Sequence, residues 1–408
     1  MANTQLLRLL ESKESSSYRR VIGEFWPREQ RLMHSLHYAV SYRGSFRPQL
    51  PDFCIRRYSQ PGDVVLDPFC GRGTTALQAN LLGRIAVSSD ISPLAVLLTR
   101  AKTAPIGLDE VVLALNQIDF NRPVDMAEFQ ERLFPFYHPH TYRELVCLRA
   151  QLRRKRDRVN AFLEMLAISR LHGHTAGYFS GYSSPHISLT PEKQQMLNLK
   201  RRVMPEHRAV APRLIKRAAQ VLRDGFTSHF FEVAGRNSAE VADARSLGWL
   251  RANSIDLVVT SPPFLDMLEH LPEQWLELWF SGSYPQQQQS RPLVCHDVDE
   301  WIAFMRQSLG EMLRVLKPQS YAVLDMGEAV TDAGPLFLDE LIAAEAGRIS
   351  HHGKRFRVQE ILIHQQKFTD FSQSFASDQN RKLSNANRLV VLQVSEAGAA
   401  RRPAKRSS

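Results

Sequence analysis

The chain contains 408 residues, of which 43% are hydrophobic, and its formal net charge at pH 7 is +10. No apolar run approaches the roughly 20 residues of a membrane-spanning helix, the N-terminus lacks a signal-peptide pattern, and the four cysteines, at positions 54, 70, 147 and 295, form no C-x-x-C pair. We therefore expect a cytoplasmic globular protein with neither a disulfide framework nor a zinc site, and its positive charge favours a polyanionic partner.

The length admits two or three average domains, or one large α/β domain with an insertion. The first 30 residues are polar and charged, and we interpret them as a helix or a loose arm. A helix is predicted over residues 48–58, before Pro61 and Gly62 lead into the first apolar run.

That run, residues 64–66, reads as a short buried parallel strand. It ends at Asp67 and is followed by Gly71 and Gly73, which permit a tight turn and a close backbone approach to a ligand. Residues 74–82 then show helical spacing. The sequence therefore predicts the first strand-turn-helix unit of a doubly wound sheet, a fold that binds nucleotide-like ligands at the carboxyl ends of its strands.

A second predicted strand, residues 85–87, leads to Asp90, and a helix follows over residues 93–102. An acid about 20 residues beyond a glycine turn is placed to accept two ribose hydroxyls. The G-x-G spacing after an acid differs from the pyrophosphate-binding pattern, and the chain contains no G-x-x-x-x-G-K-[ST] loop. A ligand with a ribose and no phosphate, such as S-adenosylmethionine, fits this pattern better.

Residues 104–230 show no alternating strand pattern, and helical stretches dominate, such as residues 142–152, 161–171 and 213–222. This segment is too long for a loop, so we expect a helical insertion with its own structure. Its dense basic run is either a solvated helix face or a phosphate-contacting face. The run comprises Arg149, Arg153, Arg154, Lys155, Arg156 and Arg158.

His172 and His174 flank a glycine within the insertion, and an aromatic-rich segment follows up to Tyr182. No third metal ligand accompanies the two histidines at a standard spacing. We interpret this segment either as a loop that contacts a nucleic-acid partner or a base flipped out of it, or as a structural loop.

The sheet resumes near Glu240, and residues 255–259 predict a buried strand that ends directly at the sequence T-S-P-P-F, residues 260–264. Trp275, Trp279 and Phe280 are interpreted as core residues of a helix. A helix over residues 299–316 and strands over 321–326, 358–363 and 389–394 complete the predicted sheet. The last residues, 397–408, predict a basic disordered tail.

Two of these stretches carry a family resemblance. Residues 67–75, D-P-F-C-G-R-G-T-T, resemble the D-P-F-x-G-x-G-T-T cofactor motif of DNA amino-methyltransferases. Residues 260–264 resemble their catalytic motif, in the S-P-P-[YF] form that is typical of N4-cytosine enzymes. The resemblance covers roughly residues 30–100 and 235–330. It implies a class I methyltransferase fold, with a doubly wound, mostly parallel seven-stranded sheet and a helical insertion.

The resemblance also implies S-adenosylmethionine as cofactor. Asp90 would hold the ribose, Asp243 would meet the adenine amino group, and Phe46 would lie beneath the methionine end. The full set of cofactor-binding residues expected in this way is Phe46, Asp67, Phe69, Gly71, Gly73, Thr74, Thr75, Asp90, Ile91, Asp243 and Ala244.

The expected catalytic residues are Ser261, Pro262, Pro263 and Phe264. An exocyclic amino group is a poor nucleophile because its lone pair is delocalised into the ring. The Ser261 hydroxyl oxygen and the Pro262 carbonyl oxygen could each accept a hydrogen bond from one of its two N–H groups. The paired prolines would fix the loop, and Phe264 would stack on the base. The base must leave the double helix to reach such a pocket, and no metal is needed.

The cofactor motif precedes the catalytic motif, whereas many N4-cytosine enzymes carry the reverse order. We expect residues 1–103 and 231–396 to form the two halves of the methyltransferase domain. Residues 104–230 are the first choice for DNA recognition and the C-terminal third is the second. Within the insertion, Arg153, Arg154 and Arg156 are expected to contact DNA phosphates.

The predicted function is methyl transfer to the N4 amino group of cytosine in double-stranded DNA. Methylation at carbon 5 is disfavoured, because none of the four cysteines follows a proline. N6-adenine methylation, methylation of a guanine amino group in RNA, and a non-enzymatic binding role remain alternatives. A cognate restriction nuclease and the oligomeric state are left open.

Overall fold

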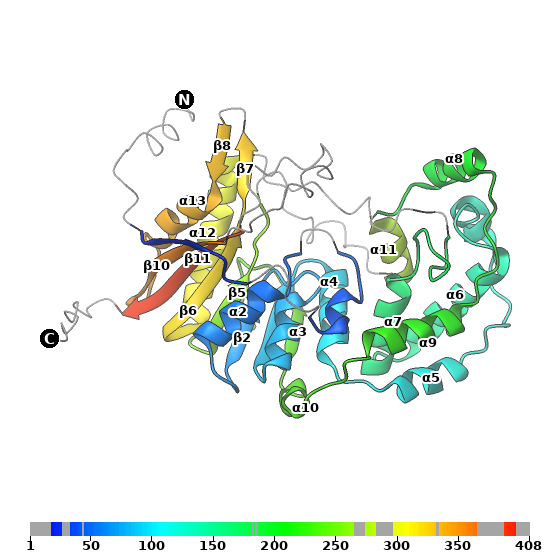
Figure 1. Ribbon diagram of the computed structural model, residues 1–408, viewed down its shortest axis with the longest axis horizontal. Coiled ribbons are helices and arrows are strands. Elements are labelled where there is room, and N and C mark those ends of the chain that lie inside the picture. Colours follow the sequence, from blue (N-terminus) through cyan, green and yellow to red (C-terminus); the bar gives the residue numbers. More distant parts are fainter. Residues whose placement is uncertain are drawn as a thin grey trace.

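The computed structural model describes residues 18–26, 33–42, 45–181, 183, 187–264, 274–282, 297–331, 334–364 and 387–396 (Figure 1). The predictions for most of the N-terminal arm, for Tyr182 and for the basic tail lie outside these residues. No helix in the described part of the chain combines the length and the apolar character that crossing a membrane requires.

A nine-stranded sheet forms the centre of the molecule, in the order β1-β10-β11-β6-β5-β2-β3-β4, with β9 paired to β10. A separate hairpin joins β7 and β8. The strands are β1 (Arg20–Gly23), β2 (Val64–Asp67), β3 (Ile85–Asp90), β4 (Ser238–Val241), β5 (Ile255–Thr260), β6 (Leu316–Met326), β7 (Glu328–Thr331), β8 (Gly334–Phe337), β9 (Ser350–His351), β10 (Lys354–His364) and β11 (Asn387–Glu396).

The chain reverses its direction of travel through the sheet between β2 and β5. It runs outward from β2 to β3 and β4 through parallel pairings, and it then returns to place β5 and β6 on the other side of β2. A doubly wound sheet binds its ligands outside the carboxyl ends of the strands at this kind of switch point. The loops after β2 and β5 therefore occupy the functional edge of the sheet.

The prediction of a doubly wound, mostly parallel α/β sheet is confirmed, but seven strands is too few. β1 pairs in parallel with β10 at the far edge, inside the segment that we interpreted as a helix or a loose arm. Its sequence, R-V-I-G, holds only two adjacent apolar residues, Val21 and Ile22, and is too short to predict a strand. β9 adds a two-residue antiparallel pairing to β10.

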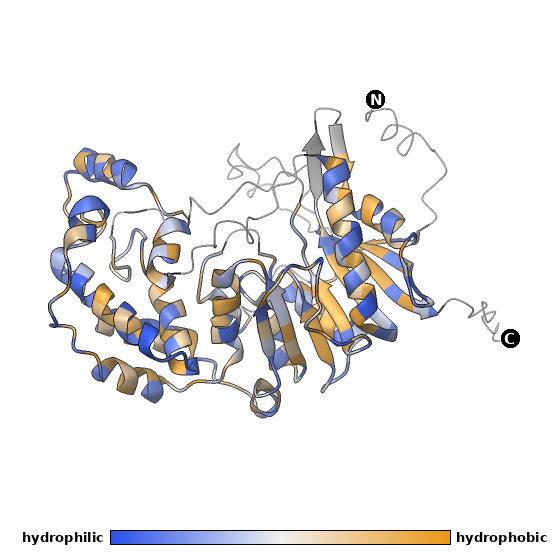
Figure 2. Cartoon of the chain, turned by 180° about the vertical axis from the view of Figure 1, so that it is seen from behind, coloured by the Kyte–Doolittle hydropathy of each residue, from blue (hydrophilic) through white to orange (hydrophobic). Residues whose placement is uncertain are grey.

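Helices cover both faces of the sheet, because successive strand residues point to opposite sides. Val65 and Leu257 pack toward α2 and α3, whereas Leu66 and Val258 pack toward α12 and α13. Figure 2 shows the strands as largely hydrophobic and the outer helices as mixed. These helices are α2 (Gln49–Tyr58), α3 (Thr74–Leu81), α4 (Pro93–Thr103), α10 (Ser228–Ala234), α12 (Val298–Val315) and α13 (Leu338–Ala346), and the 3-10 turn η1 spans Ser35–Tyr38.

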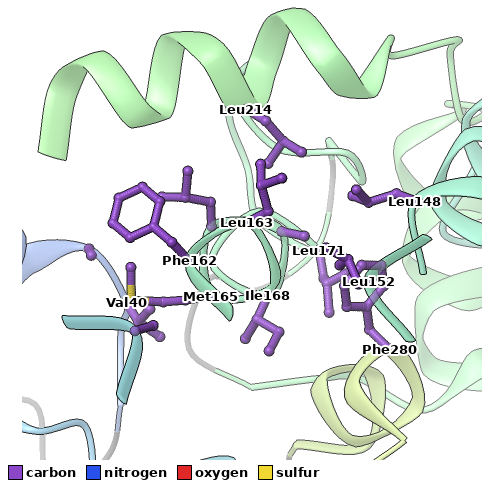
Figure 3. Close-up of a cluster of buried hydrophobic side chains, with 14 of the residues drawn as sticks. Val40, Leu148, Leu152, Phe162, Leu163, Met165, Ile168, Leu171, Leu214 and Phe280 are labelled. Carbon is purple, nitrogen blue, oxygen red and sulfur yellow. The ribbon is translucent and has the colours of Figure 1, made fainter. Parts of the chain in front are cut away.

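The segment between β3 and β4 folds as a helical module beside the sheet (Figure 1). Its central helix α7 places Phe162 and Leu163 against Leu214 of α9, and Phe280 of α11 belongs to the same core (Figure 3). The module contains α5 (Leu108–Asn116), the π-helical turn η2 (Phe129–Leu133), α6 (Pro139–Arg154), α7 (Arg158–Ile168), α8 (Pro191–Arg201), α9 (Val210–Val221) and α11 (Trp275–Ser281).

Two short helices lie on the other side of the boundaries that the sequence indicates. α10 begins inside the predicted insertion, yet it packs against α3 and β3 of the sheet. α11 follows β5 in the chain, yet its buried Leu276, Trp279 and Phe280 belong to the core of the helical module. The module is therefore built from two separate stretches of the chain.

Several helices begin with a polar cap followed directly by proline. The Ser92 hydroxyl accepts the Ala95 amide at the start of α4, and the Thr190 hydroxyl accepts the Lys193 amide at the start of α8. Such a cap satisfies an amide that has no partner within the helix, and proline at the next position has no amide to satisfy. These local signals explain why α4 begins at Pro93, as the sequence predicts, and why α8 begins at Pro191.

A buried hydrogen bond joins the carboxyl ends of β2 and β5. The Thr260 hydroxyl donates to Asp67 Oδ1 at 2.6 Å, and the Thr75 hydroxyl donates to the Val259 carbonyl at 3.3 Å. Asp67 is 2% exposed. Burial raises its pKa to about 6, although hydrogen bonds from Thr260, Thr75 and the Phe69 amide oppose the rise.

This raised pKa predicts a pH dependence of stability. The folded protein holds the Asp67 proton more tightly than the unfolded chain does. The stabilisation that this gives the folded state is therefore fully present below about pH 4 and is lost as the pH rises through 6. Over this window stability should fall by about 1.4 kcal/mol per pH unit. Asp67→Asn lacks this titration, so its unfolding midpoint relative to wild type should rise between pH 4.5 and pH 6.5.

Thermal unfolding at the two pH values measures the effect. Asp119→Asn, at an exposed position outside the sheet, is the matched control and should follow wild type. A relative stability of Asp67→Asn that does not change with pH would contradict the prediction.

Candidate active site

The turn after β2 depends on its two glycines. Gly71 and Gly73 have φ angles of 48° and 76°, in the left-handed region that side chains rarely adopt. A Cβ atom on Gly73 would lie 2.9 Å from the Thr99 Cα atom of α4. The turn therefore packs directly against a neighbouring helix and leaves its backbone close to the edge of the sheet.

Asp90, at the end of β3, holds this turn in place. Its Oδ2 accepts the Gly71 amide at 2.9 Å, and its Oδ1 accepts the Ser92 amide at 2.9 Å. Burial raises the pKa of Asp90, while hydrogen bonds from the Ser92, Gly71 and Ile91 amides oppose the rise. A carboxylate offers about four lone-pair sites, so beside these amides the side chain keeps acceptor capacity for a ligand hydroxyl.

Asp243 lies one strand further along the same edge. β4 ends two residues before it, and the Ala242 amide donates to the Asp90 carbonyl at 3.1 Å, so the two acids share one side of the sheet. Arg245 Nη2 pairs with Asp243 Oδ2 at 2.7 Å. Although burial raises it, the hydrogen bonds and charge of Arg245 hold the pKa of Asp243 below its usual value. Ala244 beside it is buried.

Of the other residues expected around the cofactor, Phe46, Phe69 and Ile91 are half-buried, whereas Thr74 and Thr75 are buried. Phe46 and Ile91 are half-buried beside the turn, and the Phe46 carbonyl accepts Arg72 Nη2 at 3.5 Å. Phe69 packs near Phe304 of α12, with ring centroids 5.9 Å apart. Thr74 and Thr75 are buried within the fold. The two threonines are therefore part of the packing between the start of α3 and the sheet.

The loop after β5 carries Ser261, Pro262, Pro263 and Phe264 beside the glycine turn. Pro262 is buried, and within the described residues no group forms a hydrogen bond with the Ser261 hydroxyl. The Phe264 ring covers Gly327 at the end of β6, where a Cβ atom would lie 2.9 Å from Phe264 Cε2. The loop is thus packed on one side while the serine hydroxyl is left available.

Trp301 of α12 also holds this loop, and the sequence did not indicate it. Its indole Nε1 donates to the Pro263 carbonyl at 2.9 Å, and the side chain is 1% exposed. A tryptophan on a helix reads as a core residue, so only the fold reveals that its one polar atom reaches the loop after β5.

The basic run lies at the end of α6 and in the short connection to α7. Arg153, Arg154 and Arg156 are exposed. Burial raises the pKa of Glu164 to about 7, and the charges of Arg156, Arg153 and Arg149 oppose the rise. Part of this positive charge therefore acts on a carboxyl group of the module itself. Of the three arginines expected to contact DNA, Arg153 and Arg156 act on Glu164 and Arg154 does not.

His172 and His174 do not act together. His172 is buried, its Nε2 lies 2.7 Å from Glu277 Oε1 of α11, and Ser188 donates to Glu277 Oε2 at 2.6 Å. His174 is exposed. The histidine segment thus anchors α11 to the helical module, which supports its interpretation as a structural loop.

A family model matches the first quarter of the chain. Residues 4–100 match a family model described as DNA methylase, of the N6/N4 type. The type II methyltransferase M.MjaII of Methanocaldococcus jannaschii is 37% identical over 70 residues, which is 17% of this chain and 13% of that protein. M.BsoBI of Geobacillus stearothermophilus, also a type II methyltransferase, is 38% identical over 61 residues, 15% of this chain and 12% of that protein.

Similarity to solved structures is weak. TrmN from Thermus thermophilus is 14% identical, with coverage of 86% of this chain and 50% of that chain, and its TM-score is 0.32. A likeness at this level carries no argument about function. The family match ends before the loop after β5, so it covers the glycine turn and Asp90 but neither Asp243 nor residues 261–264. Over residues 4–100 the chain matches the N6/N4 DNA methylase family, which confirms its resemblance to DNA amino-methyltransferases.

Proposed function

We propose that this chain is an S-adenosylmethionine-dependent DNA methyltransferase that methylates the exocyclic N4 amino group of a flipped cytosine. The observation that carries the proposal is the juxtaposition of two loops at the switch point of the sheet. One loop bears the glycine turn and the other bears Ser261, and the hydrogen bond between Asp67 and Thr260 holds them together.

The residues around the turn suit this cofactor. Asp90 presents carboxylate lone pairs for the ribose hydroxyls, and the backbone at Gly71 and Gly73 allows a close approach. Asp243 lies along the same edge, where it would meet the adenine amino group. When bound, the cofactor supplies an electrophilic methyl group on a sulfonium centre.

The loop after β5 supplies acceptors for the target amino group. The Ser261 hydroxyl oxygen accepts a hydrogen bond from one amino N–H, and the Pro262 carbonyl oxygen accepts a hydrogen bond from the other. These two hydrogen bonds orient the nitrogen lone pair toward the methyl group. Trp301 engages the Pro263 carbonyl, so the loop is held without using the Pro262 carbonyl. Phe264 is packed against Gly327 and offers its other face to the base. Placement of the two reactants would provide much of the rate.

Exposed cations on the helical module provide a surface for the DNA backbone. Arg153 and Arg154 are the last two residues of α6, and Arg156 lies in the connection to α7. Neutralising phosphates releases counterions, so contacts of this kind strengthen binding to any sequence. They would position the duplex while other residues read the bases.

N6-adenine methylation is the second candidate, because the matched family covers both N6 and N4 amino groups. A serine hydroxyl can accept a hydrogen bond from the amino group of either base. The choice of cytosine depends on the resemblance of residues 260–264 to the S-P-P-[YF] motif of N4-cytosine enzymes.

Asp90→Asn should weaken S-adenosylmethionine binding. It removes the negative charge and one acceptor oxygen, and hydrogen bonds to a charged group contribute about 1.5–3 kcal/mol, which corresponds to a loss of about tenfold or more. Calorimetric titration measures this. Glu240→Gln, at an exposed acid on the neighbouring strand, should bind as wild type does. Unchanged affinity in a folded Asp90→Asn protein would remove Asp90 from the cofactor site.

Ser261→Ala should lower the methyl-transfer rate by a factor on the order of 100, while cofactor and DNA affinities stay close to those of wild type. Single-turnover transfer of labelled methyl groups measures the rate. Ser254→Ala changes a serine just before the amino end of β5, where the hydroxyl donates to the Arg251 carbonyl, and it should retain full activity. Near-normal turnover of Ser261→Ala would exclude a catalytic role for this hydroxyl.

The methylated product distinguishes the two candidate functions. DNA that lacks methylated bases is incubated with the protein and S-adenosylmethionine, and its nucleosides are analysed by mass spectrometry. We expect N4-methylcytosine. If N6-methyladenine forms and N4-methylcytosine does not, the cytosine assignment is wrong and the proposed cofactor site stands.

A further inference from the structure

A cavity of about 260 Å³ lies where the sheet meets the helical module. Its walls come from the segment of residues 38–42, from Arg72 in the glycine turn, and from α4, α7, α9 and α11. Ligand sites often form between two packed parts of a protein. None of Asp90, Asp243 or residues 261–264 lines this cavity, so it is separate from the acceptor groups of the proposed methyl-transfer site.

Three arginines from separate parts of the chain line the cavity: Arg72, Arg170 and Arg217. All of their hydrogen-bond acceptors within the described residues are uncharged. Arg217 Nη2 donates to the carbonyls of Tyr38 and Ala39, and its Nε is buried without a partner. Arg170 Nε donates weakly to the Ser169 hydroxyl at 3.4 Å, and its guanidinium lies 4.5 Å from the centroid of the Tyr178 ring.

No carboxylate neutralises these cations within the part of the chain that the structure describes. The one acid that lines the cavity, Glu277, is already engaged by His172 and Ser188. Burial lowers the pKa of all three arginines, and the charge of Arg170 helps to lower that of Arg217 to about 10. A bound anion would remove the cost of holding these cations together.

We infer that this cavity binds a phosphate group. Three guanidinium groups around one space match the geometry of phosphate oxygens better than that of a single carboxylate, and the volume exceeds what one phosphate requires. The phosphate could belong to the DNA backbone or to a free phosphorylated molecule. Only the DNA source depends on the proposed function.

The experiment compares the full chain with Arg170→Gln, Arg170→Lys and Lys216→Gln. Arg170 is the best choice because its side chain donates fewer hydrogen bonds to the described residues than those of Arg72 and Arg217. Lysine keeps the positive charge of arginine but lacks its planar pair of donors. Lys216 is an exposed cation next to Arg217 on α9 that does not line the cavity. Each protein is heated with inorganic phosphate or with chloride at equal ionic strength, and its affinities for a short DNA duplex and for S-adenosylmethionine are measured.

We expect phosphate to raise the unfolding midpoint of wild type and of Lys216→Gln. The shift should be lost in Arg170→Gln and partly kept in Arg170→Lys. If the phosphate belongs to DNA, Arg170→Gln should also bind the duplex about tenfold more weakly and reduce the slope of log K against log salt by about 0.9. If the slope is unchanged but the phosphate shift is lost, a free phosphorylated molecule is the ligand.

Two results would overturn the inference. One is a phosphate shift that is absent in wild type or equal in wild type and Arg170→Gln. The other is an Arg170→Gln protein that loses only its affinity for S-adenosylmethionine, which would assign the cavity to the cofactor. A protein that shows the phosphate effects but transfers no methyl group would refute the proposed function alone.

Discussion

The hydrogen bond between Thr260 and Asp67 is the constraint on which the candidate site depends. It links residues 193 positions apart in the sequence at 2.6 Å, inside a sheet from which water is excluded. A buried carboxyl group without partners would be costly, so the fold is committed to keeping β2 and β5 in this register. This register fixes the positions of the glycine turn and the Ser261 loop relative to each other, because each begins within a few residues of the hydrogen bond.

The Ser261 loop is held from two directions. Trp301 of α12 fixes the Pro263 carbonyl from the sheet side, and α11, further along the chain, is embedded in the helical module. Glu277 of α11 contacts His172 and Ser188, which belong to the segment between α7 and α8. The arginine-lined cavity lies where this module meets the sheet.

The sequence predicts the parts of the site that depend on local patterns. The apolar run before Asp67, the spacing of Gly71 and Gly73, and the acid at position 90 each carry a local physical reason, and all three lie at the predicted edge of the sheet. Long-range contacts have no such signal. The Trp301 indole and the Thr260 hydroxyl look like core or turn residues until the fold shows what they reach. β1 has only four residues, which is too short to predict, because it is stabilised by pairing with β10 and not by its own pattern.

The discontinuous helical module sets an order for biosynthesis. Residues 104–230 leave the ribosome well before residues 275–281, yet the module's core is completed only when Leu276, Trp279 and Phe280 of α11 arrive. Until then the nascent chain exposes the ring of Phe136, which Trp275 later contacts, and the ring of Tyr137, which Trp279 later contacts. β5 and its loop are synthesised in the same interval. The last step in closing the module therefore coincides with the docking of β5 beside β2, so that a newly made chain acquires its module core and its candidate active site together.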